Sequence, residues 1–135
     1  MASFPLKIVT ADGLIFDGMA EKLIVRTVNG DMAVLARHIN CVCPLGMGRA
    51  VIESGGERKT AACIGGMLNV FDGAATLVPT TFEWADDIDL ARAQAAAKKA
   101  EEILAKRDEL TDQELALTEA KLKRALIRQN VYQNK

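Results

Sequence analysis

The sequence predicts an all-β N-terminal sandwich followed by a C-terminal antiparallel α-helical hairpin. Two observations support this fold class. First, all ten glycines lie at or before Gly73, and neither Gly nor Pro follows Pro79. Second, the spacing of apolar residues changes after Thr81 from the period of two that is typical of strands to the period of about 3.6 that is typical of helices. We therefore expect two domains, a β-sandwich over residues 1–84 and a helical hairpin over residues 85–135.

The N-terminal region alternates short β-rich runs with turn signals. Glycine reaches positive φ at little steric cost, and Asp-Gly or Asn-Gly pairs favour tight turns. The expected turns are Asp12-Gly13, Asp17-Gly18, Asn29-Gly30, Gly46 to Gly48, Gly55-Gly56, Gly65-Gly66 and Asp72-Gly73. The expected strands are 6–10, 23–27, 32–35, 49–53, 60–64, 67–71 and 76–78. This spacing predicts a small sandwich or barrel.

The first expected helix runs from about residue 87 to residue 106. Its apolar stripe recurs at helical spacing and consists of Leu90, Ala93, Ala97, Ala100 and Leu104. Either Asp86 or Asp87 can cap its start, because a carboxylate there accepts hydrogen bonds from the free N–H groups of the first turn.

The second expected helix runs from about residue 112 to residue 132, with Leu115, Leu122 and Leu126 as its stripe. Thr111 and Glu114 have the spacing of a capping box. The short connection between the helices predicts an antiparallel hairpin. Because its Ala-rich faces bury little apolar area, we expect the hairpin to dock only weakly on the sandwich.

Composition and charge exclude several classes of protein. The formal net charge is -1 and the pI is about 5.8, so there is no overall basic field to collect nucleic acid. No apolar run approaches the roughly 20 residues that a membrane-spanning helix needs. The N-terminus leads at once into a strand pattern, so we expect no signal peptide. Three cysteines, two of them in a Cys-x-Cys pair that is poorly placed to form a disulfide, indicate a reduced cytoplasm.

The sequence lacks the motifs of common enzymes. There is no P-loop, no Gly-x-Ser-x-Gly elbow and no Cys-x-x-Cys pair. His38 is the only histidine, and a lone histidine after an apolar strand is more often a hydrogen-bonded structural residue than a general base. Cys41 and Cys43 could bind a metal with His38, but the spacing is irregular and no fourth ligand is evident. We expect no catalytic residues and no metal site.

The basic residues of the expected hairpin are more informative. Lys121, Arg124 and Arg128 share one face of the second helix, and Arg92 and Lys99 share one face of the first. Both sets could meet anions. The alternative is that these side chains are solvated charges, those of the second helix complementing the negative end of its dipole.

Several segments taken together resemble the epsilon subunits of bacterial F-type ATP synthases. The opening stretch resembles the first strand and turn of this family. The stretch from Thr27 to His38 resembles a family segment that ends in a histidine. The similarity runs over nearly the whole chain and depends on the order and spacing of its parts. These parts are Phe4-Pro5-Leu6-Lys7-Ile8-Val9-Thr10 with Gly13, Phe16-Asp17-Gly18, Thr27, Gly30-Asp31, Val34-Leu35, Gly65-Gly66, Leu68-Asn69-Val70 and Ala85-Asp86-Asp87-Ile88-Asp89.

This resemblance implies a sandwich of about ten strands and a non-catalytic rotor subunit that couples the gamma subunit to the c-ring. It also implies that the hairpin either folds on the sandwich or extends along gamma toward the catalytic alpha-beta ring, where it inhibits ATP hydrolysis through Lys121, Arg124 and Arg128. The protein would then be peripheral to the bacterial cell membrane, on its cytoplasmic side.

Some bacterial members of this family bind ATP through an Ile/Leu-Asp-x-x-Arg-Ala motif, and Ile88-Asp89-Leu90-Ala91-Arg92-Ala93 is similar to it throughout. Lys99 departs from the arginine expected at its position, which keeps the charge but loses a bidentate phosphate contact. ATP would be a regulatory ligand and not a required cofactor. The resemblance implies ATP contacts at Glu83, Ile88, Asp89, Arg92, Lys99, Arg124 and Arg128.

Two other function classes remain open on the sequence. The chain could be a free-standing nucleotide-sensing domain, or more remotely an acyl-transfer or hydrolytic enzyme with a convergent site. Stoichiometric association with gamma would distinguish the rotor subunit from the free-standing sensor.

Overall fold

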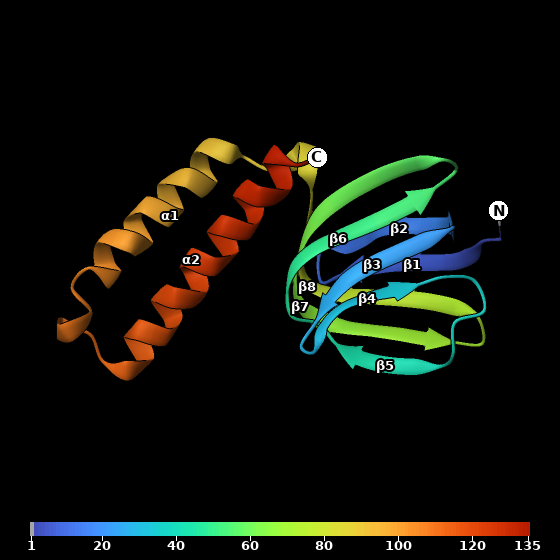
Figure 1. Ribbon diagram of the computed structural model, residues 1–135, viewed down its shortest axis with the longest axis horizontal. Coiled ribbons are helices and arrows are strands. Elements are labelled where there is room, and N and C mark those ends of the chain that lie inside the picture. Colours follow the sequence, from blue (N-terminus) through green and yellow to red (C-terminus); the bar gives the residue numbers. More distant parts are fainter. Residues whose placement is uncertain (1) are drawn as a thin grey trace. The chain divides into compact units, whose positions relative to one another are not determined.

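The computed structural model describes residues 2–135 and confirms the predicted fold class, a β-sandwich followed by a two-helix hairpin (Figure 1). The chain divides into two compact units, one ending at Trp84 and one beginning at Ala85. This division falls where the glycines and prolines end and the helical period begins.

Within the described residues the first unit contains eight strands. All adjacent pairs are antiparallel except β1 with β8, which are parallel. The order along the sheet is β2-β1-β8-β7-β6-β3-β4, and β5 pairs with β7 beside that path. The strands are β1 Phe4–Thr10, β2 Gly13–Ala20, β3 Lys22–Thr27, β4 Gly30–Val34, β5 Cys41–Pro44, β6 Met47–Ser54, β7 Glu57–Phe71 and β8 Ala74–Trp84.

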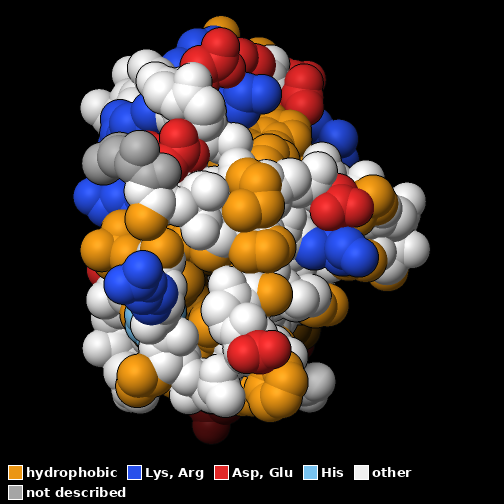
Figure 2. Space-filling view, turned by 90° about the vertical axis from the view of Figure 1, so that its right-hand side faces the viewer, with side chains coloured by type: hydrophobic (Ala, Val, Ile, Leu, Met, Phe, Trp, Pro, Cys, Tyr) orange, Lys and Arg blue, Asp and Glu red, His pale blue; other side chains and the backbone are white. Residues whose placement is uncertain are grey.

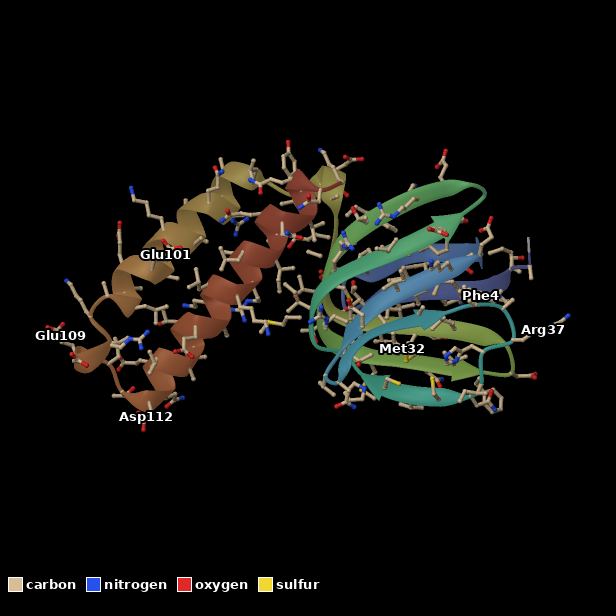
Figure 3. All side chains as sticks on the ribbon, viewed as in Figure 1. Phe4, Met32, Arg37, Glu101, Glu109 and Asp112 are labelled. Atoms are coloured by element: carbon tan, nitrogen blue, oxygen red, sulfur yellow. The ribbon has the colours of Figure 1, made fainter. Side chains whose placement is uncertain are left out.

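The core of this unit consists of the inward-facing aliphatic side chains of these strands. In β1 the side chains of Phe4, Leu6 and Ile8 are buried and alternate with exposed neighbours, as the period of two requires. Leu68 of β7 and Leu77 of β8 are register partners and have no exposed surface. Figure 3 shows Phe4 among these side chains, between the strands.

Two of the expected turns are wrong. Asp17-Gly18 lies within β2, and Gly65-Gly66 lies within β7, which runs unbroken for 15 residues. Gly66 has a φ of 101° and pairs with Pro79 of β8, whose Cα lies 2.6 Å from where a Cβ on Gly66 would stand. Glycine here lets two backbones approach closely and bends the strand without ending it. Over residues 2–135 the sandwich therefore has eight strands and not about ten, because β7 and β8 are each one long strand.

The second unit is the helical hairpin, in which α1 spans Leu90–Leu104 and α2 spans Asp112–Gln133. Short 3₁₀ turns precede each helix, η1 at Ala85–Asp87 and η2 at Arg107–Glu109. Figure 3 shows Glu109 and Asp112 at the turn of the hairpin.

The start of α1 corrects the expected cap. Asp89 is the N-cap, and its Oδ1 accepts a hydrogen bond of 3.0 Å from the N–H of Arg92, while Asp86 and Asp87 lie in the preceding 3₁₀ turn. The predicted cap of α2 is confirmed, since Thr111 Oγ1 accepts from the N–H of Glu114 over 3.1 Å.

The two helices contact each other through small side chains. Ala93, Ala97 and Ala100 are the buried residues of α1, and Thr118, Ala125 and Val131 are those of α2. In the part of the chain that the structure describes, no helix has both the length and the apolar character needed to cross a bilayer.

Candidate functional site

Five basic side chains lie on one side of the hairpin and form what we call the basic face. Three of them, Arg92, Lys99 and Lys121, are exposed, and the other two are half-buried. The basic face consists of Arg92 and Lys99 on α1 and Lys121, Arg124 and Arg128 on α2.

Helical geometry places these residues together. Each residue advances an α-helix by about 100°. Arg92 and Lys99 each stand one residue before a buried alanine of α1, and Arg124 stands one residue before buried Ala125 of α2. All three are thus displaced in the same rotational sense from the contact line between the helices. In an antiparallel pair, residues displaced in the same sense lie on the same side of the pair.

The register of the hairpin sets the levels at which these charges stand. Gln129 Nε2 of α2 donates to the carbonyl oxygen of Ala93 of α1 over 3.4 Å, and Lys135 Nζ lies 3.3 Å from Asp86 Oδ1. The end of α2 is therefore beside the start of α1. It follows that Arg92 and Arg128 stand near one level. Lys99 lies about two turns, or roughly 10 Å, from Arg92 toward the hairpin turn, and Arg124 lies about one turn, or roughly 6 Å, from Arg128 in the same direction.

The residues at the start of α1 have structural roles in this conformation. The side chain of Ile88 is buried, and the Asp89 carboxylate caps the helix. The Arg92 side chain is exposed, so its guanidinium is accessible to an anion. Of the predicted ATP contacts, the structure brings Arg92, Lys99, Arg124 and Arg128 to one side of the hairpin.

Glu83 is the predicted contact that belongs to the first unit. It lies on β8, is half-buried, and is the register partner of Ala62 on β7. The other predicted contacts all lie in the second unit.

Gln129 is a residue that the sequence analysis missed. Its amide joins the two helices, and this bond shows which residues of α1 and α2 stand at the same level. A glutamine among exposed residues of a polar helix carries no signal for such a role, because the contact joins two residues that are 36 positions apart in the sequence and lie on different helices.

A second candidate surface is an apolar patch at one end of the sandwich, formed by Leu35, Ile39 and Phe71. These side chains are 52%, 77% and 67% exposed. Leu35 and Ile39 lie in the loop that follows β4, and Phe71 is the last residue of β7. A hydrogen bond of 2.9 Å from the N–H of Asp72 to Asn40 Oδ1 joins these two segments. Figure 2 looks onto this end of the sandwich and shows hydrophobic side chains gathered among charged ones. Exposed apolar patches of this kind mark interaction sites.

His38 lies in the same loop as Ile39. Its Nδ1 is 2.8 Å from the carbonyl oxygen of Ile39, which fits the structural role expected from the sequence. Over residues 2–135 no group of three or more His, Cys, Asp and Glu side chains is arranged to hold a metal ion.

Comparison with known proteins assigns both units to one family. Residues 3–85 match the model of the ATP synthase delta/epsilon chain β-sandwich domain, and residues 86–133 match that of the delta/epsilon chain long α-helix domain.

Individual relatives and solved structures each match more than nine-tenths of this chain. The chain is 38% identical to the ATP synthase epsilon chain of Bacillus velezensis over 99% of this chain and 100% of that one. It is 37% identical to that of Caldanaerobacter subterraneus over 93% and 91% of the two chains. Among solved structures, a chain of the Euglena gracilis mitochondrial ATP synthase, in its OSCP/F1/c-ring part, superposes with a TM-score of 0.79 at 25% identity over 91% of this chain and 77% of that one. A Tetrahymena thermophila chain shares the fold, with a TM-score of 0.63 at 11% identity over 95% of each chain.

Proposed function

Because the chain belongs to the delta/epsilon family of ATP synthase subunits, we propose that it is a non-catalytic rotor subunit that couples gamma to the c-ring and inhibits ATP hydrolysis through its C-terminal hairpin. ATP binding to the hairpin modulates this inhibition. The protein acts at the bacterial cell membrane as a peripheral component on the cytoplasmic side. It requires no cofactor for its fold, and ATP is a regulatory ligand.

The sandwich is the part that binds the rotor. The apolar patch of Leu35, Ile39 and Phe71 gives it a surface suited to a protein partner. The Euglena gracilis neighbour comes from an assembly that contains F1 and the c-ring, which supports gamma and the c-ring as the partners here.

The hairpin is the part that inhibits. The buried side chains of its two helices are four alanines, one threonine and one valine, which bury little area, so the packed state is only slightly favoured and an extended state is accessible. In the extended state Lys121, Arg124 and Arg128 would meet acidic groups on the catalytic alpha-beta ring.

ATP favours the packed state because its triphosphate is held from both helices at once. The observation that carries this part of the proposal is that Arg92 and Lys99 lie on the same side of the antiparallel hairpin as Arg124 and Arg128. The bond between Gln129 and Ala93 shows that the end of α2 lies beside the start of α1. A ligand that contacts both helices binds the packed state more tightly, and it shifts the equilibrium by that difference in affinity.

Two truncations test the proposal. Residues 1–84 should fold alone and co-purify stoichiometrically with gamma, because strands β1 to β8 lie in that unit. Removal of residues 111–135 should leave assembly intact and raise ATP hydrolysis by the assembled enzyme. Failure of the full chain to bind gamma would favour a free-standing nucleotide sensor, and unchanged hydrolysis would remove the inhibitory role.

A further inference from the structure

Three sulfur atoms gather at the edge of the sandwich where β4 passes β5, and we call Met32, Cys41 and Cys43 the sulfur cluster. Cys41 and Cys43 are half-buried and alternate with exposed Val42, so both thiols lie on the inner face of β5. The Sγ of Cys43 lies 3.8 Å from the Sδ of Met32. Figure 3 shows the labelled Met32 side chain on β4 with other sulfur atoms close to it in that view.

The two thiols also interact with each other. Partial burial, together with the hydrogen bond and charge of neighbouring Cys43, raises the pKa of the Cys41 thiol. Met32 and Cys41 both pack against the buried core, so the cluster is held by the sandwich and does not lie on a free loop.

The spacing of the sulfurs suits a shared metal ion. With metal–sulfur bonds of about 2.3 Å, two sulfur ligands of one ion in trigonal or tetrahedral geometry stand about 3.8 to 4.0 Å apart. The separation of 3.8 Å between Cys43 Sγ and Met32 Sδ already falls in this range. The separation is therefore compatible with Cys43 and Met32 as two ligands of one ion.

The ligand set selects among metals. Thiolates together with a thioether favour Cu(I), whereas Zn²⁺ takes thiolate, imidazole or carboxylate ligands and commonly four of them. His38, the third ligand that the sequence suggested, has its Nδ1 against the carbonyl of Ile39. The third ligand that the structure supplies is Met32, which lies on β4, 11 residues before Cys43 in the sequence.

We propose that Met32, Cys41 and Cys43 form a three-sulfur site for a soft monovalent metal ion, Cu(I). The two thiols give up their protons on binding, as metal-bound cysteines do. Because the thiols are half-buried at the edge strand β5, an ion can reach them from solvent.

The test is an anaerobic titration of the reduced full-length chain with Cu(I) in competition with bicinchoninate. One ion should bind per chain, and X-ray absorption should find three sulfur neighbours. Met32→Leu keeps the apolar volume but removes one ligand, and it should weaken binding at least roughly 10-fold, since loss of a mere outer-shell partner typically costs 10- to 100-fold. Cys43→Ser should weaken it further.

Cys63→Ala is the matched control, because that thiol is buried elsewhere in the core and its loss should leave Cu(I) affinity unchanged. Circular dichroism of each variant without metal checks that the sandwich is folded. Several results would overturn the proposal: no stoichiometric binding, equal affinity of Met32→Leu and wild type, only two sulfur neighbours, or a Cu(I)-dependent dimer in light scattering.

Discussion

Gln129 on α2 donates its side-chain amide hydrogen bond to the main-chain oxygen of Ala93 on α1, over 3.4 Å. The Ala93 side chain is itself buried, so the bond forms at a point where the two helices are in close contact. A larger side chain at this point would separate the helices and break the bond. The register of the basic face therefore depends on a methyl group at position 93.

Ala93→Leu should open the hairpin. Extra methylenes at a close-packed position typically cost about 1–3 kcal/mol, which is large relative to the small apolar area that this hairpin buries. Amide hydrogen exchange in α1 and α2 should accelerate. Ala95→Leu, at an exposed position of the same helix, is the control and should leave exchange unchanged; equal effects of the two variants would show that residue 93 is not a contact.

Asp89→Ala should destabilise the start of α1 by about 1 kcal/mol, because it removes the carboxylate that accepts from the N–H of Arg92. Asp89→Asn is the matched control, since asparagine caps helices about as well as aspartate. Exchange of the amides at positions 90–93 measures the cap. If these amides exchange as fast in Asp89→Asn as in Asp89→Ala, the side-chain cap does not stabilise the first turn of α1.

Most of the fold follows from the sequence because its local signals agree with the final structure. Turns at Asn29-Gly30, Gly55-Gly56 and Asp72-Gly73 each join antiparallel strands, as their residue types predict. Gly65-Gly66 was misread because a glycine pair permits a turn but does not require one. Whether the strand ends there depends on the long-range pairing of Gly66 with Pro79.

The candidate sites were less accessible to sequence reasoning. The helical period is enough to place Lys121, Arg124 and Arg128 on one side of α2, yet their level relative to Arg92 requires the Gln129 bond. The Cys-x-Cys pair was visible as a candidate metal motif, but Met32 reaches it from another strand. Contacts of this kind depend on tertiary structure and leave no local pattern.

The three cysteines should differ in reactivity. Burial raises the pKa of Cys63 to about 12, and its side chain is 3% exposed. At pH 8 Cys63 is thus almost wholly protonated and shielded. Cys41, whose pKa is also raised, and Cys43 are only half-buried, so the reagent can reach both. Iodoacetamide should modify two cysteines in the folded chain, and mass spectrometry should find Cys63 labelled only after denaturation. Rapid labelling of Cys63 in the native state would contradict its burial.

Replacing Lys121, Arg124 and Arg128 together by alanine should weaken inhibition of ATP hydrolysis by the assembled enzyme. At about 0.5 kcal/mol for each exposed charge contact, the three sum to a roughly tenfold effect. Lys123→Ala, which removes an exposed charge about opposite the contact line on α2, should change hydrolysis little. The assay is run at low salt, where such contacts are strongest; inhibition that persists undiminished there would indicate a purely steric block.

Arg92→Ala should abolish detectable ATP binding to the isolated chain, because the exposed guanidinium is the cation of α1 that stands level with the end of α2. A hydrogen bond to a charged group contributes about 1.5–3 kcal/mol, and its loss weakens affinity at least roughly tenfold. Isothermal titration calorimetry with ATP measures this. Lys98→Ala is the control, since Lys98 is exposed and lies two residues before buried Ala100, on the side of α1 away from the basic face.

Lys99→Arg is the sharper test, because it should tighten ATP binding. The substitution keeps the charge and the helical position, and it replaces a single ammonium by a planar group that can hold two phosphate oxygens. Gain of one such bond predicts up to a roughly tenfold higher affinity. If residue 99 had only a structural role, there would be no reason for ATP affinity to rise, and the control Lys98→Arg should leave the affinity unchanged.

Two outcomes would contradict these predictions. Absence of heat for the wild-type chain at millimolar ATP would leave Asp89 and Arg92 as a helix cap and its neighbour. Binding that is equal in wild type, Arg92→Ala and Lys99→Arg would mean that the nucleotide contacts other residues than the basic face.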